Sequence, residues 1–176
     1  MAVAATTELE AINIMLSAIG EAPINSLTGT LPVDAKIAQS TLNEINKKVQ
    51  MEGWSFNTEI DVTLTRDGSN QISLPIDALR VDPNIHQHTT VDAIQRGLKL
   101  YDRLNNKFEF DEDLICTVVY LRDFDEIPEP ARYYMTIKAA RVFVDRLVSD
   151  QGLRTYTQED EERARAILME TDLSNG

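Results

Sequence analysis

The sequence has little cysteine, no long apolar run and no basic leader. Its single cysteine, Cys116, excludes an internal disulfide framework and a cysteine-based zinc site. The longest mostly apolar run, residues 114–121, is far shorter than the roughly 20 residues that cross a bilayer. Residues 1–8 contain no lysine or arginine ahead of an apolar run. We therefore expect no membrane span, no signal peptide and synthesis in the cytoplasm.

Basic residues are also scarce relative to acidic ones. The 176 residues include 17 Lys and Arg against 29 Asp and Glu, which gives a net charge of −12. Autonomous binding to nucleic acid or to an anionic membrane needs a positive surface, so both are excluded as primary functions. Hydrophobic residues make up 43% of the chain, enough to bury the core of one domain, and we predict a single domain over 1–176.

Four stretches have helical periodicity. Thr7 and Glu10 form a predicted capping box at the start of the first stretch, and Thr157 plays the same part in the last. In the second, Leu42 and Val49 belong to an apolar stripe that recurs every three to four residues. These patterns predict helices over about 7–20, 34–53, 129–150 and 157–172.

Between the second and third helices the period changes to two. Ile60, Val62 and Leu64 alternate with polar residues, and a turn at 67–70 leads to Ile72 and Leu74, which predicts a β-hairpin. Further short strands are expected at 98–101, 107–110 and 114–121, with a turn at Asn105–Asn106. Residues 76–97 have no sustained period and predict a loop, or a weak strand near Thr89 to Ile94. The predicted fold is therefore α+β, a four-helix bundle with a β-rich insertion over about 58–122 that projects to one side.

The sequence contains no phosphate loop, no His-Glu-x-x-His and no nucleophile elbow. His86 and His88 are a two-ligand pattern that is more typical of an exposed loop than of a metal site. Two acidic clusters offer paired carboxylates for glycoside hydrolysis or oxygen ligands for calcium, or else form solvated turns or ion pairs between subunits. They are Asp111, Glu112 and Asp113, and Asp123, Asp125 and Glu126. We predict no catalytic residue, cofactor or metal.

Five stretches, in this order, resemble a known family: SAIGEAP (17–23), LNEIN (42–46), GWSFN (53–57), LRDFDEIP (121–128) and KAAR (138–141). The sequence looks like tail tubular protein A of short-tailed bacteriophages (podoviruses), the head-to-tail connector. The resemblance implies a dodecameric adaptor ring in the virion tail, with the capsid portal and the tail nozzle as partners. Genomic DNA would pass through this ring during ejection without specific binding.

Seven residues are candidates for a subunit or partner interface. The aromatic residues Trp54 and Phe56 fill either the protein's own core or a pocket of a neighbouring subunit. Arg122 and Asp123 either bridge two subunits or fix a local turn. The three arginines of the third helix pair either with the acidic last helix or with a neighbouring copy. The candidates are Trp54, Phe56, Arg122, Asp123, Arg132, Arg141 and Arg146. The alternative function is a carboxylate-based glycoside hydrolase acting on cell-surface polysaccharide.

Overall fold

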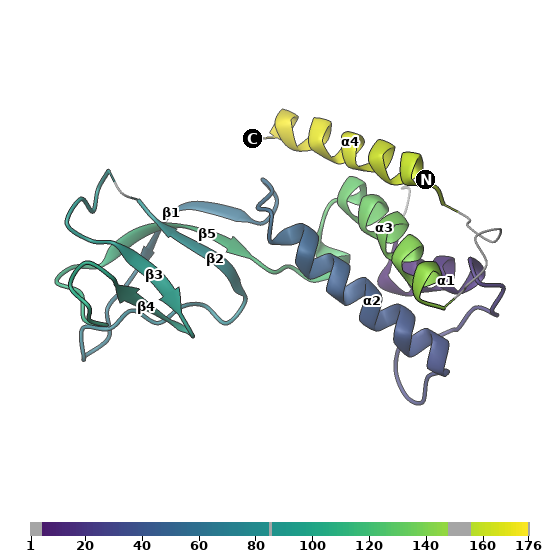
Figure 1. Ribbon diagram of the computed structural model, residues 1–176, viewed down its shortest axis with the longest axis horizontal. Coiled ribbons are helices and arrows are strands. Elements are labelled where there is room, and N and C mark those ends of the chain that lie inside the picture. Colours follow the sequence, from purple (N-terminus) through teal and green to yellow (C-terminus); the bar gives the residue numbers. More distant parts are fainter. Residues whose placement is uncertain (1–4, 85, 148–155, 176) are drawn as a thin grey trace. The chain divides into compact units, whose positions relative to one another are not determined.

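The computed structural model describes residues 5–84, 86–147 and 156–175, and the chain divides into two compact units (Figure 1). The helical unit consists of Met1–Val49 and Asp123–Gly176, and the β unit consists of Gln50–Arg122. Helices and antiparallel strands are both present, which confirms the α+β class. The β unit contains the predicted insertion but begins earlier, at Gln50. The single domain over 1–176 stays a prediction.

Four helices occupy the predicted stretches. They are α1 (Glu8–Ser17), α2 (Val33–Gln50), α3 (Glu129–Leu147) and α4 (Gln158–Asn175). Both predicted caps form: the Thr7 hydroxyl accepts the Glu10 N–H while the Glu10 carboxylate accepts the Thr7 N–H, and Thr157 and Asp160 do the same before α4. The last three residues of the predicted third helix, 148–150, lie outside the described residues.

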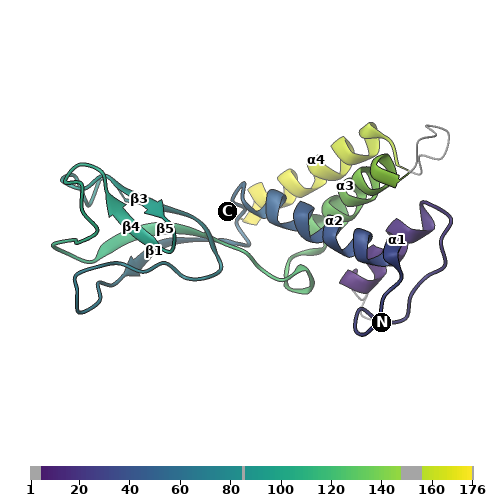
Figure 2. The same cartoon turned by 60° about the horizontal axis from the view of Figure 1, so that its bottom comes forward.

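The core of the helical unit surrounds α3. This helix packs against α1 and α4, and α4 lies on the side of α3 opposite α1 and α2 (Figures 1 and 2). From α2, Leu42, Ile45 and Val49 are buried, which confirms the predicted apolar stripe. In the described part of the chain, no helix is both long and apolar enough to span a membrane.

The β unit contains a three-stranded sheet in the order β1-β5-β2 and a separate two-stranded sheet. All neighbouring strands are antiparallel. The central strand β5 is buried along most of its length, because the two edge strands and the core cluster cover it. The strands are β1 (Thr58–Leu64), β2 (Ala78–Pro83), β3 (Ala93–Arg96), β4 (Lys99–Asp102) and β5 (Leu114–Tyr120).

The predicted hairpin between Ile60 and Leu74 is wrong in its strand pairing. Its turn exists, since the Asp67 N–H donates to the Gln71 carbonyl at 2.8 Å, but only the bridge Arg66↔Ile72 continues it. Instead, β1 pairs with β5. A bulge with Asp61 at a φ of 58° shifts the alternation, and the Ile60 side chain is consequently 74% exposed.

Other parts of the β-rich prediction also need correction. The stretch 76–97 contains β2, which was not predicted, and β3, which overlaps the end of the alternative weak strand near Thr89 to Ile94. The predicted strand at 107–110 makes only isolated bridges. Strand β2 was missed because it contains charged residues, which break the apolar alternation. An edge strand with one exposed face tolerates such residues. The turn at Asn105–Asn106 is confirmed by a φ of 52° at Asn106 and by paired hydrogen bonds between Asp102 and Lys107.

Candidate functional site

The first acidic cluster is used within the β unit. The Asp113 carboxylate accepts from the Arg66 backbone N–H at 3.0 Å and from its guanidinium at 3.3 Å, and the backbone hydrogen bond is the main reason why the pKa of Asp113 is lowered. Asp111 is 96% exposed, with its carboxylate 3.6 Å from Lys107 Nζ. A catalytic acid of a glycosidase needs a desolvated carboxyl, which this residue does not provide.

The third member of that cluster, Glu112, holds a buried histidine. His88 Nε2 accepts the Ile115 N–H at 2.9 Å, so this nitrogen carries no proton, and Nδ1 therefore donates to the Glu112 carboxylate at 2.8 Å. The expected exposed loop is wrong for His88, which the fold buries, and right for His86. Within the described residues, no group of three His, Cys, Asp or Glu side chains is arranged to hold a metal ion.

The second acidic cluster lies at the entry to α3. The Asp125 carboxylate accepts the Glu8 N–H at 2.9 Å and thereby satisfies a backbone donor in the first turn of α1. Asp123 is exposed and precedes η1 (Phe124–Glu126), and its carbonyl accepts the Glu126 N–H at 2.9 Å. These acids have structural contacts within the helical unit and do not form a desolvated pair.

Two of the candidate residues belong to a hydrogen-bonded junction between the first and last residues of the β unit. Its centre is Asn57, whose side chain accepts the Trp54 N–H at 2.8 Å and donates to the carbonyls of Gln50 at 2.9 Å and Tyr120 at 2.8 Å. The Gln50 side chain in turn bonds the backbone N–H and carbonyl of Arg122, each at 2.8 Å. Sequence reasoning missed the two amides, although both stand in or beside the GWSFN stretch.

Trp54 and Phe56 have different surroundings from one another. Trp54 is buried, with 7% of its surface exposed, and Phe56 is half-buried. Gly53, which precedes them, has a φ of 83°, and a Cβ there would lie 3.2 Å from both Arg80 and Val119. A glycine is thus required for the chain to turn at this point.

The Arg122 side chain interacts with three residues of the β unit. Its guanidinium lies 2.7 Å from the Glu59 carboxylate and 4.0 Å from that of Asp77, and it stacks 4.7 Å from the centre of the Tyr120 ring. These contacts give Arg122 a local role within the β unit. A contact of Arg122 or Asp123 with another subunit stays a prediction.

The three arginines of α3 have partners inside the helical unit. Arg132 is buried and donates to the carbonyls of Ile127 at 2.6 Å and Thr6 at 2.8 Å, and also to the Asp125 carbonyl. Arg146 donates to the α2 residues Glu44 at 2.8 Å and Thr41 at 3.0 Å. Both residues therefore hold the chain's own segments together.

Arg141 joins the acidic helix α4 to α3. It binds the Glu161 carboxylate, whose other oxygen lies 3.2 Å from Lys138 Nζ. Burial lowers the pKa of Lys138, but hydrogen bonds to Tyr134 and Glu161 outweigh this and raise it overall. Pairing with the last helix is therefore seen for Arg141, whereas Arg146 binds α2 and Arg132 binds backbone carbonyls. Interface roles for Arg132, Arg141 and Arg146 stay predictions.

Exposed apolar side chains mark surfaces that the sequence reasoning did not single out. In the β unit, Ile76 is 90% exposed, and Ile60, Leu98 and Leu104 are also exposed. On α4, Met169 and Leu173 are exposed, although the helix buries Ala164 and Leu168 on its other face. The sequence signal for the α4 surface was available, because Met169 and Leu173 are four residues apart and so share one helix face.

Two comparisons with known proteins identify the family of the chain. The model of a family described as tail tubular protein matches residues 9–176. Tail tubular protein A of Klebsiella phage KP34 is 31% identical over 166 residues, which cover 93% of this chain and 86% of that relative. Both matches include residues of the helical unit and of the β unit.

Proposed function

Because this chain belongs to the tail tubular protein family and is therefore a structural component of a phage tail, we propose that it forms the adaptor ring between the capsid portal and the tail nozzle. The observation that carries the proposal is the family match, which spans nearly the whole chain and includes both units. In this role the protein assembles as a ring of about twelve copies, with the DNA ejection channel along its axis.

The division into two units suits an adaptor. The helical unit has helices with buried inner faces, and we assign it the ring itself, with its helices packed as a four-helix bundle. The β unit exposes Ile60, Ile76, Leu98 and Leu104, large apolar side chains that a neighbouring tail protein would cover. We therefore assign contact with the nozzle to the β unit and ring closure to the helical unit.

The charge of the chain suits a channel that DNA must leave. Basic walls would bind phosphates at many points, and the affinity would add up over all copies. The chain carries a net charge of −12, and the α3 bases Lys138, Arg141 and Arg146 are already paired with carboxylates. A neutral or acidic inner wall is therefore available, and we propose that the lumen is net negative.

The same charge opposes assembly of free copies. Twelve subunits of −12 repel one another until a template holds them, so the portal would nucleate the ring. Light scattering of the purified protein should give a mass near 19.8 kDa at low salt, and a ring mass after addition of the portal of the same phage. A stable ring at low salt without portal would contradict templated assembly, and no ring in its presence would contradict the adaptor function.

A further inference from the structure

The outward face of α2 is basic and pairs with no acidic side chain among the described residues. Lys36, Ser40, Asn43 and Lys47 follow one another at helical spacing and are all exposed, opposite the buried stripe of Leu42, Ile45 and Val49. In the part of the chain that the structure describes, no carboxylate forms a salt bridge with Lys36 or Lys47. This face therefore carries two free positive charges on a molecule that is strongly acidic.

The outward face of α4 combines exposed apolar side chains with carboxylates. Ala166, Met169 and Leu173 form an exposed apolar stripe on the face away from the buried Ala164 and Leu168. Met169 is 47% exposed and Leu173 is 82% exposed. Two exposed carboxylates, Glu162 and Glu170, lie beside the stripe, and the neighbouring Arg163 is paired with Glu159. An apolar stripe with acidic borders is suited to the long alkyl stems and ammonium groups of lysines.

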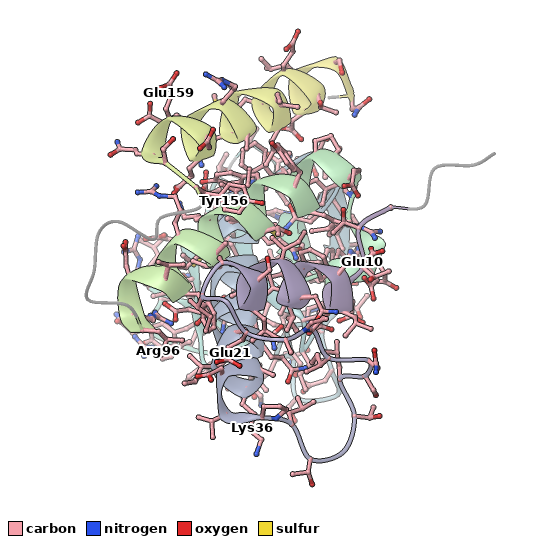
Figure 3. The ribbon with its side chains drawn as sticks, turned by 90° about the vertical axis from the view of Figure 1, so that its right-hand side faces the viewer. Glu10, Glu21, Lys36, Arg96, Tyr156 and Glu159 are labelled. Atoms are coloured by element: carbon pink, nitrogen blue, oxygen red, sulfur yellow. The ribbon has the colours of Figure 1, made fainter. Side chains whose placement is uncertain are left out.

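These two faces point away from each other within the helical unit. In Figures 1 and 2, α3 lies between α2 and α4. Figure 3 shows Lys36 of α2 at the bottom of the view and Glu159 of α4 at the top, each directed away from the other helices. Two different, complementary faces on opposite sides of one subunit give a head-to-tail contact, and such a contact closes into a ring when successive copies are slightly rotated, by about 30° for twelve copies.

We propose that the outward face of α2 in one copy binds the outward face of α4 in the next copy around the ring. This inference rests on the proposed adaptor ring and specifies which surfaces close it. Lys36 and Lys47 lie against Glu170 and Glu162 of the neighbouring copy, and Val33, an exposed apolar residue at the start of α2, adds contact with the stripe. The bases of α3 are unavailable for this contact because they bind Glu161 and Glu44 of their own chain.

Cysteine cross-linking of mixed single variants tests the contact. The native Cys116 does not interfere, because burial raises the pKa of its thiol to about 11 and keeps it protonated and inaccessible. The variants Lys36→Cys, Lys47→Cys and Met169→Cys are each made in the full chain, assembled with portal, and treated with a short bismaleimide. Electron microscopy of the same samples records whether rings are present. Asp111→Cys, at an exposed position in the β unit, is the matched control.

A head-to-tail contact predicts a covalent dimer when Met169→Cys is mixed with at least one of the two lysine variants. It predicts none from any single variant alone, and none from Met169→Cys mixed with Asp111→Cys. Rings without a mixed dimer, or a dimer from Met169→Cys alone, would overturn the inference and leave the adaptor function standing. Absence of rings in every sample, wild type included, would overturn the adaptor function and this inference with it.

Charge reversal gives a second readout that does not depend on cysteine placement. With portal present, the double variant Lys36→Glu with Lys47→Glu should reduce the yield of rings by roughly tenfold at low salt, since it replaces attraction by repulsion. Adding Glu162→Lys and Glu170→Lys to the same chain restores opposite charges across the contact and should recover most of the yield. Failure of the second pair to rescue the first, with circular dichroism unchanged, would contradict the pairing.

Discussion

Replacing Asn57 with alanine removes the side chain that joins the first and last residues of the β unit. In the native protein this side chain is 1% exposed and makes hydrogen bonds of 2.8 to 2.9 Å with the Trp54 N–H and with the carbonyls of Gln50 and Tyr120. Alanine would leave all three main-chain groups without this partner. We expect the loss to destabilise the β unit.

The magnitude follows from the number of hydrogen bonds that the variant loses. Each buried polar group without a hydrogen bond costs about 1–3 kcal/mol, so three groups would cost about 3 kcal/mol at the least. The Gln50 carbonyl keeps the Gly53 N–H as a second partner at 3.1 Å, which reduces its share. We therefore expect a loss of about 3 kcal/mol, a large part of the roughly 5–15 kcal/mol that stabilises a typical domain.

Urea denaturation followed by tryptophan fluorescence measures this loss directly. Trp54 is the single tryptophan of the sequence and lies within the junction, so its emission reports the unfolding of the β unit. The matched control is Asn43→Ala, at an exposed position on α2, which should change the free energy of unfolding by about 0.5 kcal/mol or less. If Asn57→Ala were equally mild, the junction would not hold the β unit together.

Four further predictions address the core, the acid response, catalysis and DNA. Leu42→Ala should cost about 2–5 kcal/mol by far-UV circular dichroism, because the side chain is fully buried; a melting curve unchanged within about a degree would refute this. Burial raises the pKa of Asp102, but hydrogen bonds from Asn105, Leu104 and Asp92 outweigh it and lower the pKa overall. The stability that Asp102 adds is therefore present at neutral pH and lost as the pH falls below about 4, and Asp102→Asn should flatten that loss in urea titrations across pH. Single replacements of Asp111, Asp113, Asp123 and Asp125 should leave glycan hydrolysis at background, and an activity lost in one of them would favour the hydrolase. Gel shifts should show no duplex affinity at physiological salt, whereas micromolar binding that weakens steeply with salt would mean that basic side chains face the DNA.

Local signals predicted the helices well. The caps at Thr7 and Thr157 depend on residues three apart, and the stripe of Leu42, Ile45 and Val49 depends on one helix turn after another. All the residues that form such a pattern lie within a short stretch of sequence. The observed helices therefore differ from the predicted ones only in their first and last residues. The buried strand β5 was recognisable for the same reason, since its run of residues is mostly apolar.

The pairing of strands and of charged side chains that lie far apart in the sequence was not predictable. β1 pairs with β5 across about fifty residues of chain, and nothing within β1 indicates which strand it will meet. The exposure of Ile60 depends on a bulge at Asp61, a backbone event that alternation of residue types does not reveal. Likewise, the sequence showed that α3 is basic, but only the structure shows that Arg141 binds Glu161 and Arg146 binds Glu44.

The adaptor ring is tested most directly by electron microscopy of the protein mixed with the portal of its own phage. The proposed function predicts a closed ring of about twelve copies bound to the portal, coaxial with its channel and with an open lumen. A protein that stays unbound, or that binds the portal as isolated copies without closing a ring, would contradict the account.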